Sequence, residues 1–194
     1  MSSSAPPPAS ASARRHPFDR VVLVGFMGSG KSTVGPLVAR LLGWRFLDMD
    51  RMIEERTGLS VARLFEERGE RAFRALEREA ALEASGLERL VLAAGGGAFA
   101  EPETRKALRR GAAFTVWLRC DLDTILARIP PDGNRPLATN RAIMRGLLVR
   151  REASYRLADA AVDASRGEPA DVAVRVADAV PDQRRAGGPD TLDR

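Results

Sequence analysis

Short apolar runs alternate with amphipathic stretches along most of this chain. The runs that resemble strands cover residues 20–25, 45–49, 90–94, 112–118 and 160–163. Helical spacing occurs between them, around residues 32–42, 50–57, 69–85, 102–110, 121–128, 141–157 and 170–180. Strands that are apolar throughout and separated by helices are typical of a parallel sheet covered on both faces. The sequence therefore predicts a three-layer α/β/α domain in which ligands bind at the carboxyl ends of the strands.

The two ends of the chain depart from this pattern. Residues 1–17 combine Ser, Ala and a Pro-Pro-Pro run with no acidic residue, and residues 182–194 are polar. Neither segment has enough apolar surface to offset the entropy of ordering it, so we predict disordered tails on either side of one domain at 18–181. The first segment lacks the apolar core of a secretory signal, and no apolar run approaches the ~20 residues of a membrane span. We therefore expect a cytoplasmic protein with no membrane partner.

The available residue types limit the chemistry. Cys120 is the only cysteine and His16 the only histidine, which excludes a disulfide framework, a histidine triad and a metal site built from these residues. The net charge is +5, but acidic and basic residues alternate through the middle of the chain and only 5% of residues are aromatic. Nucleic-acid binders more often cluster their positive charge and place aromatic residues within it, so we expect no nucleic-acid partner.

The glycine-rich segment after the first predicted strand carries the strongest functional signal. Residues 25–33 read GFMGSGKST and fit the phosphate-binding pattern G-x-x-x-x-G-K-[ST]. Gly28 and Gly30 let the loop amides point at phosphate oxygens, and the next helix adds the positive end of its dipole. In such loops the position of Lys31 reaches the β- and γ-phosphates and that of Ser32 is a ligand of Mg²⁺. The alternative is a glycine-rich turn with an incidental lysine.

Two carboxylates follow the second predicted strand. Asp48 and Asp50 are two residues apart, so in an extended segment both side chains project to the same side. Beside a phosphate-binding loop, Asp48 suits a position near Mg²⁺ and Asp50 suits the orientation of an attacking nucleophile. The alternative is that Asp50 only caps the start of the following helix.

Several later residues could bind an anionic ligand. Arg74 and Glu77 are i, i+3 neighbours on a predicted helix, so Glu77 can hold the guanidinium in place, although a solvated surface arginine is the simpler interpretation. Three glycines at 95–97 suit either close approach of a ligand to the backbone or a flexible turn. The loop PPDGNRPLA at 130–138 has the composition of a mobile lid, from which Arg135 could reach a transferring phosphate.

In their order, these motifs resemble those of the shikimate kinase family. GFMGSGKST, D-M-D, ERTG, F-x-x-x-G-E-x-x-F-R-x-x-E, GGG-A, RPL and R-x-x-x-Y all occur at compatible spacing over roughly residues 18–180. The resemblance implies a P-loop kinase fold with a mobile lid and a five-stranded parallel sheet in the order 2-3-1-4-5. It implies ATP-dependent phosphorylation of the shikimate 3-hydroxyl, a step of chorismate and aromatic amino acid biosynthesis, with Mg²⁺ as cofactor. We expect ATP and shikimate as small-molecule partners of a monomer.

The resemblance also assigns site residues by position. It places ATP at Gly28, Ser29, Gly30, Lys31, Ser32, Thr33 and Arg135, and Mg²⁺ at Ser32 with Asp48 close by. It places shikimate at Asp50, Arg74, Gly96 and Arg151, and catalysis with Lys31, Asp50 and Arg135. The adenine side is matched only by approximate position, at Arg128, Arg166 and Pro169.

Two other functions are compatible with a phosphate-binding loop on this fold. A sibling small-molecule kinase such as gluconate kinase would share the loop but would not call for Arg74, Arg151 and the three glycines. A catalytically idle ligand sensor is expected to have lost Lys31, Asp50 or Arg135, and this chain retains all three. Consumption of ATP with shikimate, with gluconate or with no acceptor separates these possibilities.

Overall fold

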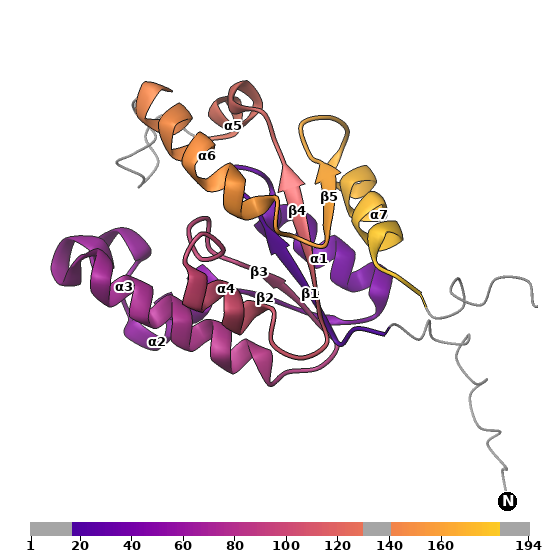
Figure 1. The fold of residues 1–194 in the computed structure, drawn as a ribbon, viewed down its shortest axis with the longest axis horizontal. Coiled ribbons are helices and arrows are strands. Elements are labelled where there is room, and N and C mark those ends of the chain that lie inside the picture. Colours follow the sequence, from indigo (N-terminus) through magenta and orange to yellow (C-terminus); the bar gives the residue numbers. More distant parts are fainter. Residues whose placement is uncertain (1–16, 130–140, 183–194) are drawn as a thin grey trace, which may run out of the picture.

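The computed structural model describes residues 17–129 and 141–182. Along these ranges the elements follow the order β1 (Arg20–Val24), α1 (Lys31–Leu42), β2 (Arg45–Asp48), α2 (Met49–Thr57), α3 (Val61–Ser85), β3 (Leu90–Ala93), α4 (Pro102–Leu108), β4 (Ala113–Arg119), α5 (Leu122–Arg128), α6 (Arg141–Tyr155), β5 (Ala160–Asp163) and α7 (Pro169–Ala179) (Figure 1). Within them no helix is both long and apolar enough to cross a membrane. Apart from residues 17 and 182, the two predicted tails lie outside the described residues and stay predictions.

The five strands form one parallel sheet in the order β2-β3-β1-β4-β5, which confirms the expected topology. β1 lies at its centre, where Val21 pairs with Val91 of β3 and with Phe114 of β4. Because the strands are parallel, their carboxyl ends lie along one edge of the sheet. The loops that follow β1 and β3 and the start of α2, directly after β2, therefore lie at that edge (Figure 1).

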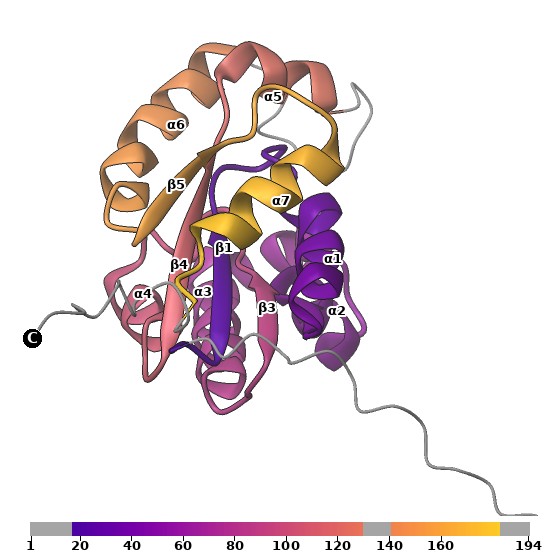
Figure 2. The same ribbon diagram turned by 90° about the vertical axis from the view of Figure 1, so that its right-hand side faces the viewer.

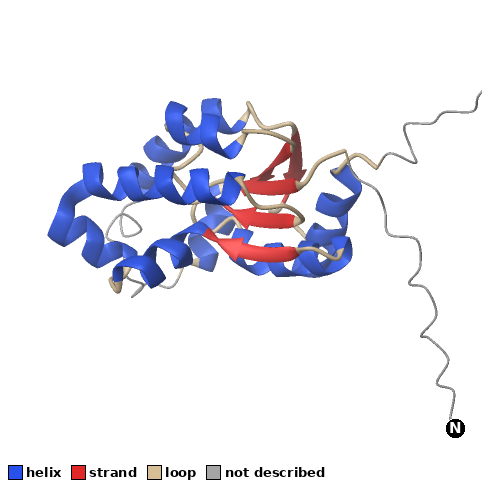
Figure 3. Ribbon diagram, turned by 90° about the horizontal axis from the view of Figure 1, so that it is seen from below, coloured by secondary structure: helices blue, strands red, loops and turns tan. Residues whose placement is uncertain are grey.

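Helices cover both faces of the sheet, as predicted for a three-layer domain. Side chains alternate along β1: Val21 and Leu23 pack with residues of α1 and α7, whereas Val22 and Val24 pack with residues of α2, α3, α4 and α6. Figure 2 shows α1 and α7 together on one face, and Figure 3 shows the strands enclosed by helices. Burial on both faces explains why β1 is apolar at four consecutive positions.

The helix boundaries differ from the prediction mainly in α3. The sequence predicts a helix from residue 69, whereas helical structure already begins at Val61, after Ser60 accepts a hydrogen bond from the Arg63 amide at 3.3 Å. Gly69 has φ 75° and ψ 171°, which divides α3 into two helical parts. Glycine adopts positive φ readily, and here the helix resumes directly afterwards. The predicted boundary is thus a break within α3, and the short first part was missed.

Candidate active site

The loop between β1 and α1 has the geometry of an anion-binding loop. Gly28 and Gly30 have φ of 75° and 95°, a region that glycine occupies at little steric cost, and Gly30 is the N-cap of α1. Ser29 is buried, and its amide donates to the Phe26 carbonyl at 3.2 Å. Thr33 is exposed in the first turn of α1. The first amides of α1 therefore meet the loop at the carboxyl edge of the sheet, where a helix N-terminus favours phosphate oxygens.

Lys31 is held inside this loop. Its side chain is only 9% exposed, and its Nζ donates to the carbonyl oxygens of Gly25 at 2.8 Å and Phe26 at 2.9 Å. Burial of an ammonium group is costly unless polar acceptors surround it, and the two carbonyls supply them. The carbonyl oxygens of the loop therefore fix the position of the Lys31 ammonium group.

Ser32 and Asp48 are hydrogen bonded to each other. The Ser32 Oγ donates to the Asp48 Oδ2 at 2.6 Å, which joins the first turn of α1 to the end of β2. The other oxygen, Oδ1, accepts from the Asp50 amide at 3.0 Å, so Asp48 is the N-cap of α2. The capping role that the sequence left open for Asp50 thus belongs to Asp48. The expected extended geometry is also wrong, because Asp50 is the second residue of α2.

The oxygen atoms of Ser32 and Asp48 fit a magnesium ion that is bound together with phosphates. Mg²⁺ takes hard oxygen ligands and is usually held by one or two protein groups plus water and substrate phosphates. A hydroxyl and a carboxylate side by side beside a phosphate-binding loop supply that donor set. Across residues 17–129 and 141–182, no group of three or more His, Cys, Asp or Glu side chains could hold a metal ion. A magnesium ion at Ser32 and Asp48 would therefore take its other ligands from phosphates and water.

Arg74 is clamped between two glutamates on α3. Its Nη1 donates to Glu77 at 2.5 Å, while its Nε and Nη2 donate to the same Glu70 oxygen at 3.3 and 2.9 Å. Glu77 is 1% exposed, and burial raises its pKa above the ordinary value although Arg74 acts in the opposite direction. The sequence predicted the Arg74–Glu77 contact, but it missed Glu70, whose i, i+4 spacing to Arg74 was available as a signal.

Two of the three glycines after β3, Gly95 and Gly97, make room for this ion pair. A Cβ at Gly97 would lie 2.6 Å from the Arg74 Nη1, and a Cβ at Gly95 would collide with Glu77 and lie 3.1 Å from the Asp50 Oδ1. The contacts with Arg74 and Glu77 would be too short for a real Cβ atom, and the contact with Asp50 would be unusually tight. The glycines therefore allow the protein's own charged side chains to approach the backbone, a reason that differs from both sequence interpretations. They also bring Asp50 next to the Arg74–Glu77 pair.

Gly96 connects this cluster to the phosphate-binding loop. A Cβ at Gly96 would lie 3.3 Å from the Met27 amide nitrogen of that loop. The Gly96 carbonyl accepts a hydrogen bond from the Arg151 Nη1 at 3.2 Å and another from the Tyr155 hydroxyl. The Arg151 guanidinium lies 5.6 Å from the centre of the Phe26 ring. The glycine-rich loop after β1 and the arginine cluster therefore lie next to each other at the carboxyl edge of the sheet.

The remaining predicted residues are less informative. The Arg128 Nη1 lies 3.6 Å from the Cys120 Sγ, beyond the carboxyl end of β4. Pro169 is the first residue of α7, and the Arg166 carbonyl accepts from Arg175. Arg135 lies outside the described residues.

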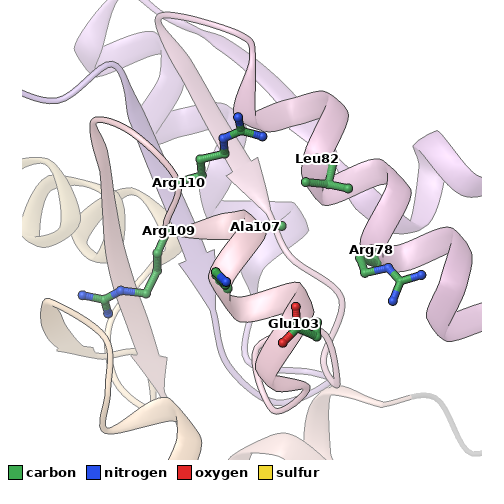
Figure 4. Close-up of a pocket in the computed structure, with 7 residues that line it drawn as sticks. Arg78, Leu82, Glu103, Ala107, Arg109 and Arg110 are labelled. Carbon is green, nitrogen blue, oxygen red and sulfur yellow. The ribbon is translucent and has the colours of Figure 1, made fainter.

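A separate groove of about 660 Å³ lies between α3 and α4 (Figure 4). Its lining includes Arg78, Leu82, Lys106 and Arg110. The Arg110 carbonyl accepts from Arg20 at the start of β1, so the groove lies toward the amino ends of the strands. It therefore shares no residue with the site at the carboxyl edge.

Comparison with known proteins agrees with this arrangement. Residues 27–181 match the family described as shikimate kinase. The chain is 44% identical over 162 residues to a shikimate kinase of Moorella thermoacetica (82% of this chain, 93% of that protein) and 43% identical over 160 residues to one of Geobacter sulfurreducens (81% and 88%). A solved shikimate kinase from Acinetobacter baumannii in complex with shikimate aligns at a TM-score of 0.78 and 36% identity, covering 82% of this chain and 90% of that one. Over this extent, sequence and fold agree, and the chain belongs to the shikimate kinase family.

Proposed function

We propose that this protein transfers the γ-phosphoryl group of ATP to the 3-hydroxyl of shikimate. The observation that carries the proposal is the junction at residues 95–97, where the phosphate-binding loop meets two arginines and a carboxylate. Gly96 contacts the loop and Arg151, and Gly95 lies against Asp50. Family membership supports the same reaction.

The loop end of the site suits the triphosphate. The loop amides and the Lys31 ammonium, which points back along the loop, would surround the β- and γ-phosphates, where negative charge is greatest. Ser32 and Asp48 would hold Mg²⁺, which when bound neutralises phosphate charge and orients the phosphates for transfer. Both protein oxygens are already positioned by their mutual hydrogen bond.

The other end of the site suits a polyhydroxylated acid. Arg74 and Arg151 are held by protein partners and can receive a carboxylate by charge-assisted hydrogen bonds. The Asp50 carboxylate lies against Gly95, beside this cluster, where a hydroxyl of the acceptor would face the γ-phosphate. The carboxylate would orient that hydroxyl and take up its proton as the new O–P bond forms, while the bond from the γ-phosphorus to the bridging oxygen breaks and ADP leaves.

The test is a direct assay of the purified protein. With ATP and Mg²⁺ we expect shikimate to be converted to shikimate 3-phosphate, identified by ³¹P NMR and mass spectrometry, with equimolar ADP. Gluconate and a reaction without acceptor serve as controls and should release little ADP. Phosphorylation of gluconate in place of shikimate would support the sibling-kinase alternative, and ATP binding without turnover would support a sensor.

Two arginine substitutions test the acceptor site. Arg74→Ala and Arg151→Ala should each raise the KM for shikimate about 10- to 100-fold, because each removes charge-assisted hydrogen bonds worth about 1.5–3 kcal/mol. The KM for ATP should change little. Steady-state kinetics with each substrate varied in turn measures both values.

Arg74→Ala needs a control, because it leaves the buried Glu77 without its counter-ion and should lower stability. The double variant Arg74→Ala, Glu77→Gln removes that charge. If Arg74 binds the acceptor, the double variant keeps the raised KM for shikimate while regaining stability to urea. Parallel increases of both KM values would argue against the assignment.

Three features of the proposal rest on the sequence and the family resemblance. Arg135 would contact the transferring phosphoryl group, and the protein would act as a monomer in the cytoplasm. Sedimentation equilibrium of the full chain measures the oligomeric state.

A further inference from the structure

Tyr155 is a buried tyrosine whose hydroxyl reaches the candidate site. It is the last residue of α6, and its side chain is 0% exposed. The hydroxyl donates to the Gly96 carbonyl, the same oxygen that accepts from the Arg151 Nη1. From the sequence alone this residue is typical of a core tyrosine. A tyrosine that only fills the core would not need to form its hydrogen bond at the proposed substrate site.

The ring of Tyr155 is fixed by the core, so the position of its hydroxyl is also fixed. The ring centre lies 6.0 Å from that of Trp117 on β4. Burial raises the pKa of Tyr155 to about 12, so the hydroxyl remains a donor at physiological pH. The tyrosine thus links the end of α6 and strand β4 to the loop after β3.

Arg151 shares its hydrogen-bond acceptor with the same hydroxyl. Arg151 and Tyr155 are one turn apart on α6 and lie on the same face. The Tyr155 hydroxyl and the Arg151 Nη1 donate to the same oxygen, the Gly96 carbonyl, and the guanidinium also lies 5.6 Å from the centre of the Phe26 ring. Removal of the hydroxyl would therefore loosen both the guanidinium and the carbonyl that orients it.

We propose that Tyr155 is a positioning residue of the acceptor site, whose hydroxyl holds the Gly96 carbonyl and the Arg151 guanidinium in the arrangement that receives the substrate carboxylate. This inference rests on the proposed function. A guanidinium that is already ordered loses less conformational entropy when a carboxylate binds, so binding is tighter than to a mobile one. Tyr155 itself need not touch the substrate.

The test is Tyr155→Phe, which keeps the ring and removes only the hydroxyl. We expect the KM for shikimate to rise about five- to tenfold, the change that follows from losing one hydrogen bond to a charged network. The KM for ATP and kcat should stay within about twofold. Because KM does not depend on the amount of folded enzyme, partial unfolding cannot produce this split.

Two further measurements separate positioning from general packing. The KM for shikimate methyl ester, which lacks the carboxylate charge, should be nearly the same in wild type and Tyr155→Phe. In addition, the double variant Arg151→Ala, Tyr155→Phe should have a KM for shikimate less than about twofold above that of Arg151→Ala. The guanidinium that the Tyr155 hydroxyl positions is already absent from Arg151→Ala.

Thr115→Val is the matched control. Thr115 lies on β4 and is also fully buried. Its hydroxyl donates to the Asp159 carboxylate at 2.6 Å and not to Gly96. Its loss should lower the melting temperature without changing either KM. Equal increases of both KM values in Tyr155→Phe, or no change in either, would overturn the positioning role while leaving the proposed function intact. A wild-type protein that fails to phosphorylate shikimate would overturn both.

Discussion

Asp50→Asn is expected to lower the turnover of shikimate phosphorylation by about 10²–10⁴-fold, the usual contribution of a positioned general base. Asparagine keeps the shape of the side chain but cannot accept the proton of the attacking hydroxyl. The affinity for ATP should be nearly unchanged, because Asp50 lies toward the arginine cluster, against Gly95. Single-turnover phosphoryl transfer with saturating substrates measures the effect on chemistry directly.

The substitution should leave the fold intact. Asp48 caps α2, and the Asp50 backbone amide that it binds is still present in the variant. Asp123→Asn is a suitable control, because Asp123 is an exposed carboxylate that pairs with Arg141. A variant at position 50 with near-normal turnover would remove Asp50 from the chemistry and leave it as a residue of the helix start.

Lys31→Ala is expected to lower turnover by about 10²–10³-fold and to weaken ATP binding as well. The ammonium is held at the loop by two carbonyl oxygens, so it meets the phosphates without reorganisation, and such preorganised charge is the largest contribution to many enzymatic rates. Stopped-flow transfer rates and equilibrium binding of an ATP analogue give the two effects separately.

The chain supplies its own control for this experiment, because Lys106 is the only other lysine. It lines the groove between α3 and α4, far from the phosphate-binding loop. Lys106→Ala should leave turnover and ATP affinity within about twofold of wild type. Similar losses in the two variants would mean that net charge, and not the position of Lys31, determines nucleotide binding.

The proposed acceptor site shows how far sequence reasoning extends. Arg74 and Glu77 are three residues apart on a helix, so their contact follows from local geometry and was predicted. Glu70 lies one turn before Arg74, and its ion pair with Arg74 follows from the same local geometry. Local helix geometry does not explain why residues 95 and 97 are glycine. A side chain at either position would collide with atoms of α3, some twenty residues earlier in the chain.

Local order along the chain determined the larger part of this protein. Apolar strands between helices predicted the parallel three-layer sheet, and the spacing of GFMGSGKST predicted a phosphate-binding loop at the end of its first strand, because both depend on periodicity and backbone geometry over a few residues. Contacts between distant segments were decided only by the tertiary structure. Asp48 caps α2 and also binds Ser32, 16 residues earlier, and Tyr155 reaches the carbonyl of Gly96, 59 residues earlier. Such pairings depend on how α1, α6 and the loop after β3 pack on one sheet, and no spacing within a single segment specifies that packing.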